Sequence, residues 1–204
     1  MLRTFAATLA PALALALLPG CTNDQDGKFD AFVERSEPFR GELTEETCEE
    51  RFDISGDYML TMSTHLSRDK PLLLGATFAV DPATWEVSCD FHMLNLTDAE
   101  QADRAEVGAL YSASGTIAED GSFTLDFGIV DVPAAANPIT FSEIQANLVL
   151  EGCTKSADLA CGAVEGNVVT PHIDLATSTW GSARVDGDIT TAPVVLSCAA
   201  TADQ

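Results

Sequence analysis

Histidine is the first residue type to consider, because imidazole serves both as a general base and as a metal ligand. In the alternating segments of the chain, His65 and His92 fall on the face opposite the apolar side chains, and Asp90 falls on that face too. On neighbouring strands these three residues would form a metal site; the alternative is that they are ordinary exposed strand residues. His172 follows Pro171 and is expected in a loop.

The motifs of well-known catalytic sites are absent from the sequence. It has no G-x-S-x-G serine elbow, no H-E-x-x-H zinc helix, no phosphate-binding loop and no dinucleotide fingerprint. Asp24-Gln25-Asp26-Gly27 begins like a calcium loop but is out of register further on, and Asp186-Gly187-Asp188 is better explained as a turn. We therefore predict no enzyme, no cofactor and no resident metal. Calcium at one acidic loop, and a hydrolase or metal enzyme with an unrecognised site, are the alternatives.

The chain begins with a pattern typical of a secretory signal peptide. Arg3 provides a basic start, and residues 5–18 form an uncharged run rich in Ala and Leu. Such peptides carry ~7–15 apolar residues after a basic start, whereas a helix that crosses a bilayer needs ~18 or more. Ala14-Leu15-Ala16 is an alternative cleavage site that would release a soluble secreted protein, but it leaves only a short apolar core.

The apolar run ends in Leu18-Pro19-Gly20-Cys21, which resembles the lipobox of bacterial lipoproteins. In that family a diacylglyceryl group is attached to the cysteine thiol, and the peptide before the cysteine is removed. The resemblance implies a signal peptide over residues 1–20 and a membrane anchor at Cys21, since two or more acyl chains anchor a protein stably. Thr22, rather than Asp, follows the pattern for the outer membrane, so we expect a lipid-anchored location in the cell envelope.

The remaining chain divides into two parts by composition. Residues 21–47 are polar and acidic and are expected to form the lipidated Cys and a tether, and residues 48–204 to form one β domain. The formal net charge of the whole chain is −22 at pH 7. This charge disfavours nucleic acid and anionic membrane surfaces as partners, because both attract basic proteins.

The chain contains 6 cysteines, which fits an oxidising compartment. With Cys21 used for the lipid, an odd number remains for disulfides. Our first expected pair is Cys153 with Cys161, because the polar stretch between them closes a small loop. Cys48 would then pair with Cys198 and leave Cys89 as a buried free thiol, although pairing of Cys48 with Cys89 is nearly as well supported.

From Ile54 onward, apolar and polar residues alternate with the period of β-strands. Asp120-Gly121 lies between two alternating runs, which is the strongest short-range signal for a hairpin. Further strands are expected near residues 144–150, 161–170, 179–186 and 192–198. We predict an all-β antiparallel meander of about eight or nine strands, closed as a barrel or a barrel-like sandwich. The residues expected to point inward include Phe78, Phe91, Met93, Phe123, Leu125, Phe127 and Ile129.

Three stretches of this region, ANPIT, CGAVEGNVVTP and DLATSTWGSARV, resemble those in lipobox-bearing proteins of myxobacteria and their relatives. That resemblance implies a location and a β-rich domain, and no activity. We predict a non-enzymatic binding or interaction domain that meets the membrane through Cys21. The alternative is a lipocalin-like carrier, because an eight-stranded barrel can hold one small apolar ligand. A cavity of several hundred Å³ would favour the carrier, and a filled core would favour the interaction domain.

Overall fold

The computed structural model describes residues 48–96 and 104–198, and these form an all-β domain, as predicted. Short 3-10 turns follow two of the strands, η2 (Ala134–Ala136) and η3 (Ile189–Thr191). The strands are β1 (Gly56–Ser63), β2 (Leu72–Val80), β3 (Glu86–Leu94), β4 (Glu106–Thr116), β5 (Ser122–Val132), β6 (Ile144–Ser156), β7 (Leu159–Val168), β8 (Ile173–Asp174) and β9 (Ser178–Arg184).

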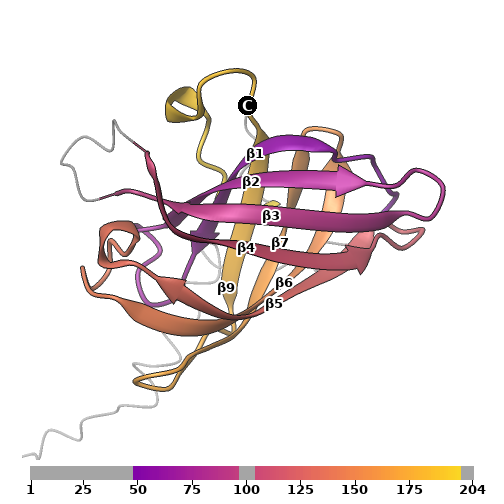
Figure 1. The fold of residues 1–204 in the computed structure, drawn as a ribbon. Coiled ribbons are helices and arrows are strands. Elements are labelled where there is room, and N and C mark those ends of the chain that lie inside the picture. Colours follow the sequence, from indigo (N-terminus) through magenta and orange to yellow (C-terminus); the bar gives the residue numbers. More distant parts are fainter. Residues whose placement is uncertain (1–47, 97–103, 199–204) are drawn as a thin grey trace, which may run out of the picture. The chain divides into compact units, whose positions relative to one another are not determined.

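The strands form one antiparallel sheet that curls into a nearly closed barrel (Figure 1). Their order is β4-β3-β2-β1-β9-β7-β6-β5, and the two-residue strand β8 pairs with β7 outside this path. Consecutive strands are paired from β1 to β4 and from β5 to β7, and β9 joins the two series by pairing with both β7 and β1. This is the predicted antiparallel meander, and of the two predicted alternatives, barrel and barrel-like sandwich, the structure is a nearly closed barrel.

The barrel closes along a seam between β4 and β5. The two strands are joined by the predicted Asp120-Gly121 turn, in which Gly121 has a φ of 88°. Further along the seam the Tyr111 hydroxyl accepts the N–H of Asp131 at 2.7 Å and donates to its C=O at 3.3 Å. One side chain thus bonds to both backbone groups of a residue on the opposite strand, where a continuous ladder would use a backbone partner.

The barrel interior is filled by large apolar side chains, including Trp180, Tyr58, Phe78 and Phe91. Trp180 pairs in register with Gly162, and a Cβ at Gly152 would collide with its ring. Its indole N–H donates to the Glu151 carbonyl at 3.0 Å. The absence of a side chain at Gly152 therefore leaves the room that the indole ring needs at this point of the core.

A second, smaller hydrophobic cluster lies on the outer face of β1–β3, where Met59, Leu73 and Leu94 pack with Ala192. The segment after β9 covers this face, so the strand predicted over 192–198 is wrong. Both edges of β9 are already paired, with β1 and with β7, and no edge is free for a further strand. The segment instead packs across the outside of the sheet, where Thr179 donates to the Leu196 carbonyl.

The four cysteines expected in disulfides are all bonded, but the pairs are Cys48–Cys153 and Cys161–Cys198. The predicted Cys153–Cys161 and Cys48–Cys198 pairs are therefore corrected, and so is the Cys48–Cys89 alternative. The segments that enter and leave the barrel place Cys48 and Cys198 with Cα–Cα separations of 5.4 and 5.3 Å from their partners. These separations are ordinary for disulfides. Two disulfides indicate an extracytoplasmic location.

The inward face of β5 differs from the prediction at one residue. Ile129 is 56% exposed, whereas Phe123 and Leu125 are buried as expected. The register between β5 and β6 shifts between Asp126 and Gly128. A β-bulge inserts one residue and so reverses which side chains face the core after it. Val130 and Val132 consequently point inward in place of Ile129.

Candidate binding site

A cavity of about 60 Å³ lies inside one end of the barrel. This end carries the loops 64–71, 133–143 and 169–177, and we call it the open end; the end with the turns 81–85, 117–121 and 157–158 is the closed end. The lining is apolar except for one threonine and one asparagine. It consists of Met62, Thr64, Leu66, Leu72, Met93, Val130, Val132, Asn137, Ile139, Ile144, Ala146, Leu148, Val164, Val168 and Leu175.

The strands position this lining through their alternation. Met62 lies near the end of β1, Leu72 at the start of β2 and Met93 near the end of β3. Ala146 and Leu148 near the start of β6 and Val164 and Val168 on β7 complete the wall. Side chains two residues apart on a strand share a face, so each of the strands β1, β2, β3, β5, β6 and β7 supplies one to three residues to this layer.

Asn137 holds the β5–β6 loop over the cavity. Its side-chain N–H₂ donates to the Thr140 hydroxyl at 2.7 Å and to the Ser142 carbonyl at 2.8 Å. Its side-chain oxygen accepts the N–H groups of Ile139 and Thr140, both at 3.2 Å. These four bonds use both donors and both lone pairs of the amide. Asn137 is therefore a structural residue of the loop, and its amide has no capacity left for a ligand.

Thr64 is the other polar residue in the lining. Thr64 is 8% exposed, and its hydroxyl oxygen is buried without a hydrogen-bond partner. The backbone of the same turn is well bonded, since Ser67 donates to the Thr64 carbonyl and His65 donates to the Ser178 hydroxyl. Among the side chains that line the cavity, Thr64 is thus the one with an unused hydrogen-bonding group.

Apolar side chains are exposed in the loops of the open end. Leu66 in the β1–β2 loop is 46% exposed, Phe141 in the β5–β6 loop 61% and Val169 after β7 37%. Leu66 also lines the cavity, so the lining reaches the protein surface there. The Lys70 ammonium lies 6.0 Å from the Phe141 ring centroid and links two of these loops.

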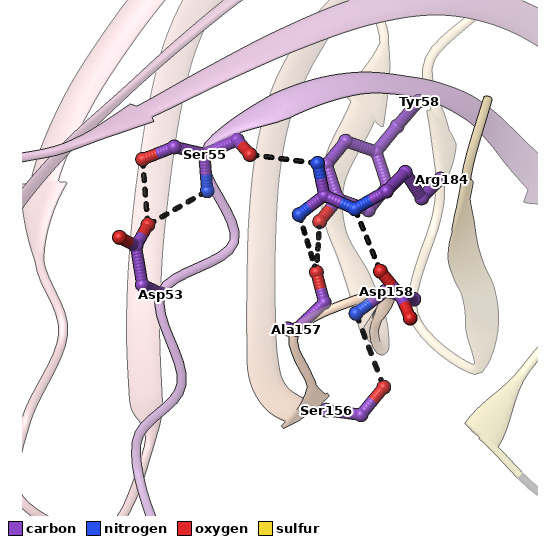
Figure 2. A network of polar contacts seen from close by, with 7 residues as sticks. All are labelled: Asp53, Ser55, Tyr58, Ser156, Ala157, Asp158 and Arg184. Atoms are coloured by element: carbon purple, nitrogen blue, oxygen red, sulfur yellow. Dashed lines mark hydrogen bonds and ion pairs between the residues drawn. The ribbon is translucent and has the colours of Figure 1, made fainter. Parts of the chain in front are cut away.

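The closed end is held by a polar clasp around Arg184 (Figure 2). The Arg184 guanidinium donates to the Ser55 carbonyl at 2.8 Å, to the Ala157 carbonyl at 2.6 Å and to the Asp158 carboxylate at 2.7 Å. It also lies 5.0 Å from the ring centroid of Tyr58, whose hydroxyl donates to the Ala157 carbonyl at 2.6 Å. The clasp joins the start of β1, the end of β9 and the β6–β7 turn.

The segment before β1 fills the closed end. Ile54 is fully buried in the main core, and the Arg51 guanidinium stacks 4.2 Å from the centroid of the Trp85 ring. Asp53 accepts the backbone N–H and the hydroxyl of Ser55, and these hydrogen bonds lower the pKa of the Asp53 carboxyl. The clasp and this segment fill the closed end of the barrel. Among the described residues, the candidate site for a ligand is therefore the cavity at the open end.

The structure does not bring the sequence-predicted histidines together. His92 lies 3.8 Å from the Glu106 carboxylate, whereas His65 is exposed at the open end, next to Ser178. His172 lies in the loop between β7 and β8, as predicted, beside Asn167. Within residues 48–96 and 104–198, no group of three His, Cys, Asp or Glu residues is placed to hold a metal ion.

Cys89 is a free thiol, as in one of the two pairings left open by the sequence, and it is fully buried on β3. Burial raises the pKa of the Cys89 thiol to about 12. A thiol that stays protonated at neutral pH is a poor nucleophile. Asp186-Gly187-Asp188 forms a turn in which Asp188 accepts the Thr190 N–H, as expected.

Two predicted sites lie outside the described residues, the lipidation site at Cys21 and the acidic stretch Asp24–Gly27. Among the residues that the structure does describe, no helix is long and apolar enough to cross a membrane. The cavity residues Thr64, Leu66 and Asn137 were missed as a site from the sequence. The Asn137-Pro138 break is the signal that places a loop at this end, but nothing in the sequence shows what the loop covers.

Comparison with protein-family models and with curated proteins finds no match. Among solved structures, the chain is similar to a redesigned beta barrel, with a TM-score of 0.37 and 11% sequence identity. The similarity covers 65% of this chain and 92% of that chain. The discussion of function therefore rests on the cavity and the loops around it.

Proposed function

We propose that this protein is a lipid-anchored, non-enzymatic binding protein of the cell envelope, whose barrel takes an apolar group at its open end. The observation that carries the proposal is the apolar cavity of about 60 Å³, with exposed Leu66 and Phe141 in the loops of the same end. Exposed apolar side chains beside an apolar cavity are typical of binding sites.

The cavity volume limits what the barrel can take. Sites that enclose a whole small molecule measure about 300–1,000 Å³, and an apolar cavity of about 150 Å³ binds benzene. A cavity of about 60 Å³ accepts a branched group of a few atoms. We therefore favour the insertion of an apolar side chain or the end of an aliphatic chain, with the rest of the ligand outside, over the enclosed ligand of a lipocalin-like carrier.

The attachment point of the proposed anchor supports this use of the open end. The chain before Cys48 joins the barrel at the closed end, where Cys48 is bonded to Cys153. Cys153 and Ile144 lie nine residues apart on β6, which corresponds to ~30 Å along a strand. The point at which the tether is attached, Cys48, is therefore at the other end of the domain from the cavity.

The methionines provide a direct test of apolar binding. The chain has 4 methionines; Met62 and Met93 line the cavity, and Met59 belongs to the outer cluster. In the full chain carrying Cys21→Ala and ¹³C-methyl methionine, xenon or isobutane should shift the Met62 and Met93 methyl signals and leave Met59 unchanged. Ala146→Ile, which fills the cavity, should abolish these shifts. Equal shifts at all three methyls, or none, would overturn the proposal.

The anchor needs a separate test, because its failure would leave the binding site untouched. Mass spectrometry of the mature N-terminus should find acyl chains on Cys21 in the wild-type chain and none in Cys21→Ala. An unmodified wild-type chain that begins at Leu17 or Thr22 would refute the lipid anchor.

A further inference from the structure

We propose that the two disulfides form a redox switch, in which a dithiol reductant converts them into a single bond between Cys153 and Cys161. We call these two residues the sheet cysteines, and Cys48 and Cys198, which the conversion releases, the end cysteines. The inference is independent of the cavity. It follows from the positions of the four sulfurs, because the sheet cysteines are register partners and each is bonded to an end cysteine.

The sheet cysteines are placed to bond to each other. Residues directly opposite on antiparallel strands have Cα atoms about 4.5 or 5.5 Å apart, and disulfides span Cα separations of about 4.4–6.8 Å. The next register pair consists of Gly152 and Gly162, and a Cβ added at Gly162 would lie 2.6 Å from the Gly152 Cα. Because this pair has no side chains, β6 and β7 approach closely beside the sheet cysteines.

The sheet cysteines are less accessible than the end cysteines. Cys161 is fully buried and Cys153 is 7% exposed, whereas both end cysteines are partly exposed. Ala160 belongs to the main core, so the next residue, Cys161, faces the outside of the barrel, as does its register partner. An external thiol therefore reaches an end cysteine first, and the sulfur that leaves is that of a sheet cysteine.

The exchange proceeds in three thiolate attacks. A thiolate of the reductant attacks the Cys198 sulfur, and the Cys161 sulfur leaves as a thiolate. This thiolate attacks the sulfur of its register partner Cys153, so the Cys153–Cys161 bond forms and Cys48 leaves and takes up a proton. The second thiol of the reductant then attacks the mixed disulfide at Cys198, which also leaves and takes up a proton.

Entry at Cys48 gives the same product through the reverse order of attacks. In either case two electrons and two protons pass from the dithiol to the protein. The reductant becomes a disulfide, and the two protein disulfides become one disulfide and two thiols. Without a reductant, the linkages Cys48–Cys153 and Cys161–Cys198 remain.

The sheet favours the new bond once one disulfide has been reduced. The ladder between β6 and β7 holds the sheet cysteines opposite each other, whereas both end cysteines lie outside the strands. Two thiols at fixed, adjacent positions have a higher effective concentration than two thiols of which one lies on a connecting segment. The Cys153–Cys161 bond is therefore the expected linkage of the protein after uptake of two electrons.

The exchange also removes a covalent link of the segment after β9. This segment covers the outer cluster, where Ala192 packs with Met59. Without the bond at Cys198, it keeps noncovalent contacts such as the hydrogen bonds from Thr179 to the Leu196 carbonyl and from Arg104 to the Ala192 carbonyl. The switch thus couples the redox state of the cysteines to the cover over the outer cluster.

The test is graded reduction of the full chain carrying Cys21→Ala with dithiothreitol. Acid quenching, alkylation of thiols in denaturant and peptide mapping then identify the linkages. The product that has taken up two electrons should carry one alkyl group on each end cysteine and a linkage between the sheet cysteines. Cys89 is free in the structure and reports complete alkylation. Alkylation of one sheet cysteine together with its own end cysteine would show independent reduction and overturn the proposal.

Serine variants test the central attack without a reductant. Cys198→Ser leaves the Cys161 thiol opposite the Cys48–Cys153 bond, so mapping should find Cys153–Cys161 as the main linkage and Cys48 free. The matched control Cys161→Ser also breaks this disulfide but removes the attacking thiol, and it should retain Cys48–Cys153. The same retained linkage in both variants would overturn the proposal.

The methionine methyl signals report on the cover over the outer cluster. In the product that has taken up two electrons, the Met59 signal should shift, because Met59 packs under Ala192. Met62 in the main core should keep its signal and so show that the barrel is intact. An unchanged Met59 signal in a product that contains the Cys153–Cys161 bond would overturn the coupling to the cover.

Discussion

Cys153 on β6 and Cys161 on β7 lie directly opposite each other in the sheet. Cys153 is bonded to Cys48, before the first strand, and Cys161 to Cys198, after the last strand. Gly152, next to Cys153, lies against the Trp180 ring, and Gly162, next to Cys161, is the register partner of Trp180. Both cysteines therefore belong to the outer face of the barrel. A single register pair of the sheet thus bonds the chain that enters the barrel, at Cys48, and the chain that leaves it, at Cys198.

The disulfides predict a ranking of stabilities. Cys48–Cys153 closes a loop with a sequence separation of 105, and Cys161–Cys198 one of 37. On chain-entropy grounds, replacing the first pair by serines should lower the free energy of unfolding by roughly 5 kcal/mol and the second by roughly 4 kcal/mol. Denaturant unfolding measures both losses. Peptide mapping without reduction should recover the same two linkages, and a Cys153–Cys161 peptide would contradict the structure.

The Arg184 clasp predicts a stability effect at the closed end. Arg184→Met keeps the aliphatic stem over Tyr58 but leaves the Ser55 and Ala157 carbonyls without their charged donor. It should lower the free energy of unfolding by about 2–3 kcal/mol. The control is Asp158→Asn, which should cost less than about 1 kcal/mol because that carboxylate is 73% exposed. Equal losses in denaturant unfolding would show that the ion pair, and not the carbonyl bonds, holds the clasp.

Buried acids predict a loss of stability at alkaline pH. Burial raises the pKa of Cys89 from 9.0 to about 12 and that of Tyr58 from 10.0 to about 12. The unfolded chain therefore releases these protons first, so the stabilisation is complete below pH 9 and is lost as the pH rises toward 12. Each group contributes a slope of about 1.4 kcal/mol per pH unit within its own window.

Two variants assign these slopes. In unfolding curves measured from pH 8 to 11, Cys89→Ala should remove the fall that begins near pH 9, and Tyr58→Phe the additional fall above pH 10. A wild-type slope in Cys89→Ala would mean that the thiol ionises in the native state.

The seam predicts a local effect on hydrogen exchange. Tyr111→Phe removes the partner of both backbone groups of Asp131, so the Asp131 amide should exchange faster and the domain should lose about 1 kcal/mol of stability. Amide exchange by mass spectrometry resolves β4 and β5 peptides from the ladder between β1 and β2, which serves as the internal control. Uniform acceleration across all strands would show that the seam does not open by itself.

The sequence alone determined the class of the fold, because strand alternation is a local property. The period of two located the strands, marked Phe78, Phe91 and Phe123 as core residues, and placed a turn at Asp120-Gly121. With Cys21 set aside, an odd number of cysteines left one thiol over, and one of the two open pairings assigned it to Cys89, which is free in the structure although the partners of that pairing are wrong.

Only the tertiary structure decided the features that depend on contacts between distant segments. The bulge at Asp126–Gly128 turned Ile129 outward, and the paired edges of β9 kept the last segment from forming a strand. The disulfide partners followed from where the two chain ends cross the outside of the sheet. The cavity beside Thr64 exists because residues from most of the strands and three loops meet at one end, and no local pattern in the sequence records how closely they pack.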